Sequence, residues 1–230
     1  MGRPLFSLEN YVHRNLFSEC IYPWDALKRL DVYLRSLKGL KPIDPVLFPQ
    51  TYLVNAESIF IDEGTVIEPG AYIQGPCVIG KRCQIRHGAY LRGGVLMGDE
   101  CVVGHATEVK HSILLNYVAA AHFNYVGDSI LGNHVNLGAG VKCANVKINS
   151  GSVFVHWENR KVDTGLLKLG ALIADGVRLG CNCVTNPGTI LGRDSICYPA
   201  LSIHGQVPEK GVVRSIHKQL QTSVFLKELP

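Results

Sequence analysis

Aliphatic residues recur at every sixth position through the middle of this 230-residue chain. Ten consecutive positions at this spacing carry one: Ile61, Ile67, Ile73, Ile79, Ile85, Leu91, Met97, Val103, Val109 and Leu115. A small or β-branched residue lies four positions after each of the first nine. Six is a multiple of the two-residue period of a strand but not of the 3.6-residue period of a helix, so the pattern predicts short strands.

Three such strands close one triangular coil of 18 residues, and coils stack at the inter-strand spacing of about 4.8 Å. The aliphatic positions then form columns inside an all-β solenoid, where each buried side chain contributes roughly 1.5–3 kcal/mol. The period returns at Leu131 and Leu137 after a phase shift, is absent over 142–168 and resumes at Ile173. We therefore expect an inserted loop over 142–168, and a segment extruded from a solenoid commonly carries function.

The two ends of the chain do not follow the six-residue pattern. Proline and tryptophan at 23–24 open a segment with apolar residues at helical spacing, which ends at Gly39. We expect an N-terminal helical cap or linker over 1–50, packed on the open amino-terminal end of the solenoid. The β-helix is expected over 51–205, and a short helical tail over 206–230.

Composition narrows the class of protein further. Hydrophobic residues make up 47% and charged residues 18% of the chain, which predicts a folded protein. The net charge of +4 is too small to indicate nucleic-acid binding, and no basic run with interleaved aromatic residues supports it. The N-terminus lacks the apolar core of a secretory signal, and the apolar stretch 113–126 is too short to span a bilayer. We expect a cytoplasmic protein with neither a nucleic-acid nor a membrane partner.

Eight cysteines suggest metal or disulfide chemistry until their positions are considered. Cys77, Cys83 and Cys101 occupy the repeat position where a small apolar side chain is wanted. Cys181 and Cys183 lack the spacing of a zinc-binding pair. We therefore expect most of the cysteines to pack in the core, and no metal site.

Candidate chemistry begins with two cations. Arg92 and Lys110 are 18 residues apart, one whole coil, so they are expected to stack on the same face. Two adjacent cations suggest an anion such as a phosphate between them, although two solvated surface cations would fit the same spacing. His122 lies in a stretch that departs from the repeat, where either a structural or a catalytic role is possible. Asn136 and Asn145 have the residue type of turns and corners.

The motifs from 88 to 145 resemble a known family of enzymes. They look like the acetyltransferase domain of the bifunctional N-acetylglucosamine-1-phosphate uridyltransferase/glucosamine-1-phosphate acetyltransferases. The matching stretches are Glu108–Lys110, His122–Asp128, Val135–Gly140 and Cys143–Asn145. Residues 161–188 resemble the archaeal-type sugar-phosphate nucleotidyltransferase/acetyltransferase branch, and residues 23–27 are similar to the linker between its two domains. The resemblance, together with that to hexapeptide-repeat proteins generally, implies a left-handed parallel β-helix.

The resemblance also implies a reaction and a role for individual residues. His122 would be the general base that takes a proton from the sugar ammonium, so that the amine attacks the thioester of acetyl-CoA. Arg92 and Lys110 would hold the sugar phosphate. Tyr125 and Asn136 would position the sugar, and Asn145 would lie near the reacting groups. The backbone near Ala139 would contact the thioester. Lys168 and Arg214 would bind the CoA phosphates.

The implied reaction is N-acetylation of an amino-sugar phosphate, glucosamine-1-phosphate above all, in the synthesis of UDP-N-acetylglucosamine. Family members are trimers with sites shared between subunits, so a homotrimer is expected here. Nothing in residues 1–50 resembles the nucleotide-binding loop of the nucleotidyltransferase half, so uridylyl transfer is not predicted, and a separate nucleotidyltransferase is a possible partner. The segment 146–160 differs from the family's usual loop, which leaves the exact acceptor open.

Three other functions are alternatives for a solenoid of this kind. A zinc enzyme like the γ-class carbonic anhydrases needs two ligand histidines five residues apart, and no pair among the five histidines from His87 to His134 has that spacing. Acyl transfer to a different amino-sugar nucleotide is a second alternative. The third is a non-catalytic solenoid that senses a sugar phosphate or mediates assembly.

Overall fold

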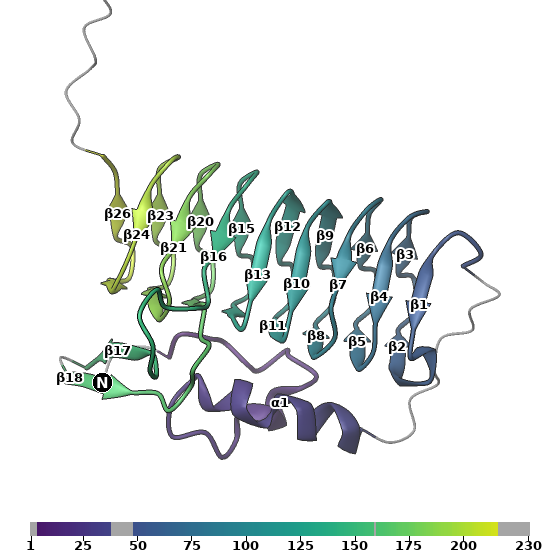
Figure 1. Ribbon diagram of the computed structural model, residues 1–230, viewed down its shortest axis with the longest axis horizontal. Coiled ribbons are helices and arrows are strands. Elements are labelled where there is room, and N and C mark those ends of the chain that lie inside the picture. Colours follow the sequence, from purple (N-terminus) through teal and green to yellow (C-terminus); the bar gives the residue numbers. More distant parts are fainter. Residues whose placement is uncertain (1–3, 38–47, 159, 216–230) are drawn as a thin grey trace, which may run out of the picture.

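The protein is a left-handed parallel β-helix with three long faces (Figure 1). The computed structural model describes residues 4–37, 48–158 and 160–215. Each face is an 8-stranded sheet in which all strands are parallel, and successive strands of the chain belong to successive sheets. Each coil therefore contributes one strand to each face, as the six-residue period predicts.

The strands are short. Sheet I consists of β1 (Tyr52–Val54), β4 (Tyr72–Gln74), β7 (Tyr90–Leu91), β10 (Glu108–Lys110), β13 (Tyr125–Gly127), β16 (Lys142–Cys143), β21 (Val184–Thr185) and β24 (Ser202–Ile203). Sheet II consists of β2 (Ile59–Ile61), β5 (Cys77–Ile79), β8 (Val95–Met97), β11 (Ser112–Leu114), β14 (Ile130–Leu131), β19 (Ala171–Ile173), β22 (Thr189–Leu191) and β25 (Gln206–Val207). Sheet III consists of β3 (Val66–Ile67), β6 (Gln84–Ile85), β9 (Val102–His105), β12 (Ala119–His122), β15 (Asn136–Leu137), β20 (Arg178–Leu179), β23 (Ile196–Cys197) and β26 (Val212–Val213).

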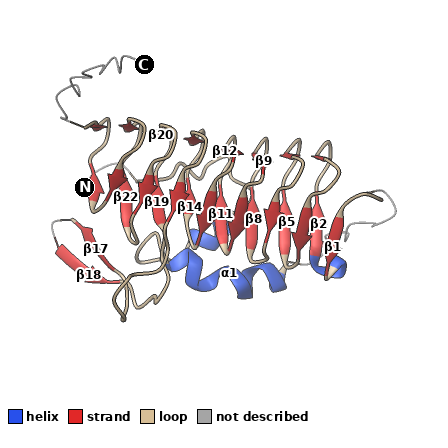
Figure 2. Ribbon diagram, turned by 45° about the horizontal axis from the view of Figure 1, so that its top comes forward, coloured by secondary structure: helices blue, strands red, loops and turns tan. Residues whose placement is uncertain are grey.

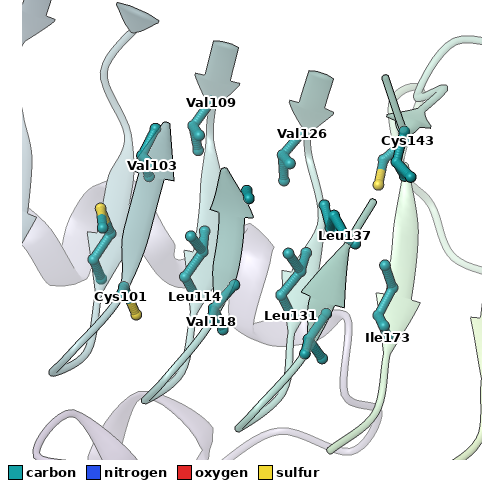
Figure 3. Close-up of a cluster of buried hydrophobic side chains, with 14 of the residues drawn as sticks. Cys101, Val103, Val109, Leu114, Val118, Val126, Leu131, Leu137, Cys143 and Ile173 are labelled. Carbon is teal, nitrogen blue, oxygen red and sulfur yellow. The ribbon is translucent and has the colours of Figure 1, made fainter. Parts of the chain in front are cut away.

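The interior is filled by columns of aliphatic side chains contributed by all three sheets. Figure 3 shows part of this core, with Val103, Val109, Leu114, Val126, Leu131, Leu137 and Ile173 among the labelled residues. The predicted inward positions from Ile73 through Val109 are at most 1% exposed. Cys77, Cys83 and Cys101 are fully buried in the same core, which confirms their packing role.

The tenth predicted position is wrong by one residue. Leu114, not Leu115, pairs with Met97 and enters the core, because the step from Val109 to Leu114 has five residues instead of six. Leu115 is buried in a second apolar cluster, outside the solenoid. One coil therefore has 17 residues, and the coil after it repeats this length at Leu131.

The N-terminal segment covers the flank of sheet II, so its predicted place at the open end of the solenoid is wrong (Figure 2). It contains a short 3-10 helix (Arg14–Phe17) and α1 (Asp25–Ser36), and a second 3-10 helix (Ala56–Ser58) lies between β1 and β2. The outward residues of sheet II that it covers are apolar: Val78, Leu96, Ile113, Ile130, Leu172 and Ile190. Strands buried on both faces read as continuous apolar runs, and sheet II has such runs while the other two sheets alternate. That apolar outer face is the reason the helix lies along the side.

The inserted loop leaves the solenoid after β16. Lys142 and Cys143 are still in the sheet, so the excursion begins near Asn145 rather than at 142. It carries an antiparallel hairpin, β17 (Phe154–Trp157) and β18 (Arg160–Asp163), and returns at β19. The Trp157 ring meets that of Trp24 edge-on at 5.8 Å, so the excursion packs on the N-terminal segment.

The C-terminal end differs from the helical tail expected over 206–230. Val207 and Val213 belong to strands β25 and β26, so the solenoid extends to 213. The rest of the predicted tail, 216–230, lies outside the described residues. Among the helices that the structure describes, none is long and apolar enough to cross a membrane.

Candidate functional site

The corner between sheets I and II changes length where the site lies. Three residues separate Leu91 from Val95, but only two separate the register-matched positions Val109 and Ser112, and two again separate Val126 and Ser129. His111 directly follows β10 and Asp128 directly follows β13, with φ of 44° and 46°. Aspartate enters this left-handed region more readily than most residues, because its short side chain can bond locally. The two residues lie 17 apart, so they stack one above the other.

Asp128 is the centre of a polar cluster at this corner. Its side chain is 8% exposed, and its carboxylate accepts hydrogen bonds from Lys110 Nζ at 3.1 Å and from His111 Nδ1 at 3.0 Å. Asn145 Nδ2 donates a third hydrogen bond to it. Burial alone would raise the pKa of Asp128, but the bonds from His111, Asn145 and Lys110 outweigh it and the pKa is lowered. The carboxylate is therefore ionised at neutral pH and holds three side chains.

Arg92 lies one coil before Lys110, as its 18-residue spacing predicts. Its guanidinium bonds Glu108 at 2.6 Å, which raises the pKa of the arginine, and it lies 5.7 Å from the centre of the Tyr90 ring. Each of the two predicted phosphate-binding cations thus has a carboxylate partner, Glu108 for Arg92 and Asp128 for Lys110. Both cations keep exposed surface, 42% and 25% of their side chains, toward which an anion can approach.

Tyr125 and Asn145 complete this corner. Tyr125 is the first residue of β13, and its hydroxyl donates to Asn145 Oδ1 at 3.4 Å. Burial and the charge of Glu108 raise the pKa of Tyr125. Lys168 lies at the return of the excursion, where Val146 and Lys168 form an antiparallel bridge, and it is exposed.

His122 lies on the neighbouring corner, between sheets III and I. It ends β12, is exposed, and pairs in register with His105 of the coil before. Ala139 lies on the next coil beside it, because the N–H of Gly140 donates to the His122 carbonyl at 2.9 Å. The three residues of β13 separate this corner from Asp128, a span of about 10 Å. No hydrogen bond joins the His122 ring to any other described residue.

Asn136 and Arg214 lie farther from the Asp128 cluster. Asn136 faces outward from sheet III beside Arg178, in an open hollow whose lining includes Tyr117 and His134. Arg214 follows the last strand of the solenoid and is exposed. The structure thus brings together Arg92, Lys110, Tyr125 and Asn145, with Lys168 near the last of them, places His122 and Ala139 on the adjacent corner, and leaves Asn136 and Arg214 apart.

Sequence reasoning missed the residues that organise the cluster. Asp128, His111 and Glu108 received no role, although two of them occur in the matching motifs. The available signal was the break in the six-residue period after Val109, which marks the shortened corners. Among the described residues, no three His, Cys, Asp or Glu side chains are placed to hold a metal ion.

Comparison with known proteins assigns the chain to a family. A family model described as the GMPPB C-terminal domain matches residues 73–223, which is more than half of the chain. The chain belongs to the GMPPB C-terminal domain family. The matched range contains the whole Asp128 cluster.

Two of the following three curated relatives of this family member have the word acetyltransferase in their names. A bifunctional sugar-1-phosphate nucleotidylyltransferase/acetyltransferase of Sulfurisphaera tokodaii is 34% identical over 99 residues, 43% of this chain and 25% of that protein. Bifunctional protein GlmU of Methanococcus aeolicus is 30% identical over 173 residues, 75% of this chain and 41% of that one. The chain therefore spans only a quarter to two fifths of these two relatives. The putative uncharacterized acetyltransferase YaiX of Escherichia coli is 30% identical over 171 residues, 74% of this chain and 73% of that protein.

Solved structures show only a weak likeness to this chain. The polysialic acid O-acetyltransferase OatWY has 12% sequence identity and a TM-score of 0.37, covering 76% of this chain and 94% of that one. A mutant of AntD, an N-acyltransferase from Bacillus cereus in complex with dTDP and Coenzyme A, has 14% identity and a TM-score of 0.32, covering 74% and 88%. Likeness at this level gives no information on the substrate of the present chain.

Proposed function

We propose that this family member is an acetyl-CoA-dependent N-acetyltransferase whose acceptor is an amino-sugar phosphate, most specifically glucosamine-1-phosphate. The observation that carries the proposal is the Asp128 cluster, where Lys110 and Asn145 are fixed beside Arg92 at one corner of the solenoid. Two cations with exposed surface suit a phosphate, and the adjacent amide and hydroxyl suit the hydroxyl and amino groups of a sugar. The names of the curated relatives support the acyltransferase class.

The proposed reaction forms an amide and breaks a thioester. The amine nitrogen of the sugar bonds to the acetyl carbon, the carbon–sulfur bond breaks, and the CoA thiolate takes up the second proton that the nitrogen loses and leaves as the thiol. His122 is the general base that accepts the first proton that the ammonium loses. The backbone N–H near Ala139 is assigned to the thioester oxygen, where negative charge develops in the transition state. Gly140 bonds the His122 carbonyl, so these two groups lie on adjacent coils.

The remaining assignments extend from this reaction. Arg92 and Lys110 bind the phosphate, and Tyr125 with Asn136 positions the sugar. Lys168 and Arg214 are proposed to bind the CoA phosphates; both are exposed. About 10 Å of strand separates the His122 corner from the Asp128 corner, and a homotrimer in which neighbouring chains line one site is the arrangement we propose. We place the protein in the cytoplasm, with a separate nucleotidyltransferase as the enzyme that uses its product.

An acceptor series tests the proposed function. Purified protein is incubated with acetyl-CoA and glucosamine-1-phosphate, glucosamine-6-phosphate or glucosamine, and the N-acetylated product is measured by mass spectrometry. We expect the 1-phosphate to be the best acceptor, and Arg92→Ala to raise its KM more than it lowers kcat, since it removes a binding contact. Equal rates with all three acceptors would overturn the phosphate assignment. Binding of the 1-phosphate with no product from any acceptor would favour the non-catalytic sensor instead.

A further inference from the structure

The side-chain amide of Asn145 has a fixed orientation. A carboxylate at neutral pH only accepts hydrogen bonds, so the group that Asn145 directs at Asp128 is its NH₂. Its carbonyl oxygen Oδ1 then faces the other way, toward the hydroxyl of Tyr125. That contact is 3.4 Å long, weaker than an ordinary hydrogen bond between two side chains, so a ligand N–H can replace it.

The backbone leaves room for this arrangement at one position. Gly127 occupies the place in its coil that Lys110 occupies in the coil before. A Cβ atom built on Gly127 would lie 2.6 Å from the Tyr125 hydroxyl and 2.8 Å from Asn145 Nδ2. Neither distance is possible for a real Cβ, so a side chain at 127 would displace both groups. The glycine is required because Tyr125 and Asn145 pass over it.

We propose that Asp128 is a positioning residue that makes Asn145 a hydrogen-bond acceptor for the acceptor substrate's amino group while it fixes Lys110 for the phosphate. The positioning role of Asp128 goes beyond the proposed function, and it rests on that function for the identity of the substrate. The Asn145 oxygen accepts a stronger hydrogen bond from an ammonium than from a neutral hydroxyl. Charge-assisted hydrogen bonds are roughly twice as strong as neutral ones, so a preference on the order of tenfold is expected.

The chain provides a matched control for removing a buried carboxylate. Asp175 is also almost buried, accepts hydrogen bonds from the backbone N–H groups of Ser7 and Asn133, and pairs with Arg193 at 3.1 Å. It lies on the corner where residues 4–10 meet the solenoid, away from the Asp128 cluster. Asp175→Asn therefore removes the same charge from the same fold without touching Asn145 or Lys110.

The test compares the affinities of glucosamine-1-phosphate and glucose-1-phosphate, measured by calorimetry on the full chain. Wild type is expected to prefer the amino sugar about tenfold. Asp128→Asn is expected to abolish that preference, because Asn145 is then free to turn, and Asp175→Asn is expected to retain it. Lys110→Ala is expected to weaken both ligands by similar factors, since both carry the phosphate. An unchanged preference in Asp128→Asn would overturn the proposal.

A second variant keeps the test valid if Asp128→Asn does not fold. Gly127→Ala removes no polar group but displaces Asn145, so it is expected to lower the preference for the amino sugar as well. If Gly127→Ala retained that preference, the proposal would be contradicted. Enzyme assays separate this inference from the proposed function. Amino-sugar preference without any CoA release would leave the positioning role intact and overturn the function. If Asp128→Asn releases CoA and still prefers the amino sugar, the proposed function stands and the positioning role of Asp128 is overturned. A wild type that binds neither ligand would overturn both the positioning role and the proposed function.

Discussion

Individual residues at the corners of the solenoid determine where polar groups can gather. A coil turns three times, and at most of these turns one residue takes a positive φ, as Arg82, Tyr117 and Asp194 do. Where the corner between sheets I and II is one residue shorter, the left-handed residues of two adjacent coils, His111 and Asp128, contact each other through their side chains. Asp128 occupies such a position, with φ of 46°, and bonds His111 of the preceding coil. The backbone conformation thus positions the Asp128 carboxylate, which in turn holds Lys110 and Asn145.

Core residues differ from corner residues in what they contribute to stability. Ile85→Ala is expected to lower the free energy of unfolding by about 2–5 kcal/mol, because it leaves a cavity in a column of fully buried side chains. Gln84→Ala, at the exposed neighbouring position of the same strand, is expected to change it by less than about 0.5 kcal/mol. Urea denaturation of both variants checks this, and similar losses would contradict the assignment of inward and outward faces.

The sequence predicted the columns but not the residues that interrupt them. A repeated aliphatic position is visible because many coils carry it, whereas Asp128 and His111 each occur once. Their importance depends on a one-residue shortening of the chain, which makes neighbours of residues 17 positions apart. A pattern search that assumes a constant period of six reads the shortening as noise, and for that reason Leu115 was placed in the core in place of Leu114.

Among the secondary-structure elements, the N-terminal segment is the one whose burial is most informative. Its helix α1 buries Ala26, Leu27, Leu30 and Leu34 against the apolar outer face of sheet II. The helix itself was predictable from its spacing of apolar residues. The position of the helix was not predictable. The strand boundaries must be known before one can tell which of the three sheets has an apolar outer face. The hairpin within the excursion, β17 and β18, was likewise absent from the prediction, since it contains no repeat.

The N-terminal segment also carries a pH-sensitive contact. His13 is 9% exposed, and its Nδ1 lies 3.0 Å from the Tyr33 hydroxyl of α1. Burial lowers the pKa of His13 from 6.5 to about 4, against the opposing charge of Asp99. The unfolded chain then binds a proton that the folded chain rejects between these two values. Stability from this source is present above about pH 6.5 and is lost as the pH falls toward 4, by at most about 3 kcal/mol.

Denaturation followed by tryptophan fluorescence at pH 7.5 and pH 5 measures this effect. His13→Gln, which cannot titrate, is expected to show a smaller loss of stability between the two pH values than wild type. His134→Gln removes an exposed histidine and serves as the control. Equal losses in wild type and His13→Gln would contradict the role given to His13.

The whole molecule is a rod with one covered and two open long faces (Figure 1). Sheet I presents Tyr52, Tyr90 and other outward side chains, and sheet III presents Ile196 and Val212, all of them exposed in a single chain. Exposed apolar surface on this scale suits contact with further copies of the chain. The trimer expected from the resemblance would cover part of it and bring the corner of one chain toward the face of another.

Light scattering of the purified protein measures the assembly. A homotrimer predicts a mass of three times the 25.2 kDa of one chain, constant over a tenfold dilution. A mass of one chain at all concentrations would contradict the shared site, because His122 and Lys110 would then remain on separate corners. In that case the chemistry would have to be reassigned to the Asp128 corner alone.

The sequence predicted the site in part. Motif resemblance selected Arg92, Lys110, Tyr125 and Asn145, and the structure places these four at one corner. It also selected His122 and Asn136, which lie elsewhere on the same chain. Spacing within one chain places residues only along that chain's own coils, so the shared site that we propose could not be obtained from it.

Release of CoA measures most directly whether His122 catalyses acetyl transfer. Wild type, His122→Ala and His87→Ala are incubated with acetyl-CoA and glucosamine-1-phosphate, and thiol formation is followed with correction for the protein's own cysteines. His87 is an exposed histidine on the same corner as His122, two coils earlier, and provides the control. We predict turnover by wild type and by His87→Ala, and a loss of about 10²-fold or more in His122→Ala. No turnover by wild type, or equal turnover by all three proteins, would contradict general-base catalysis of acetyl transfer by His122.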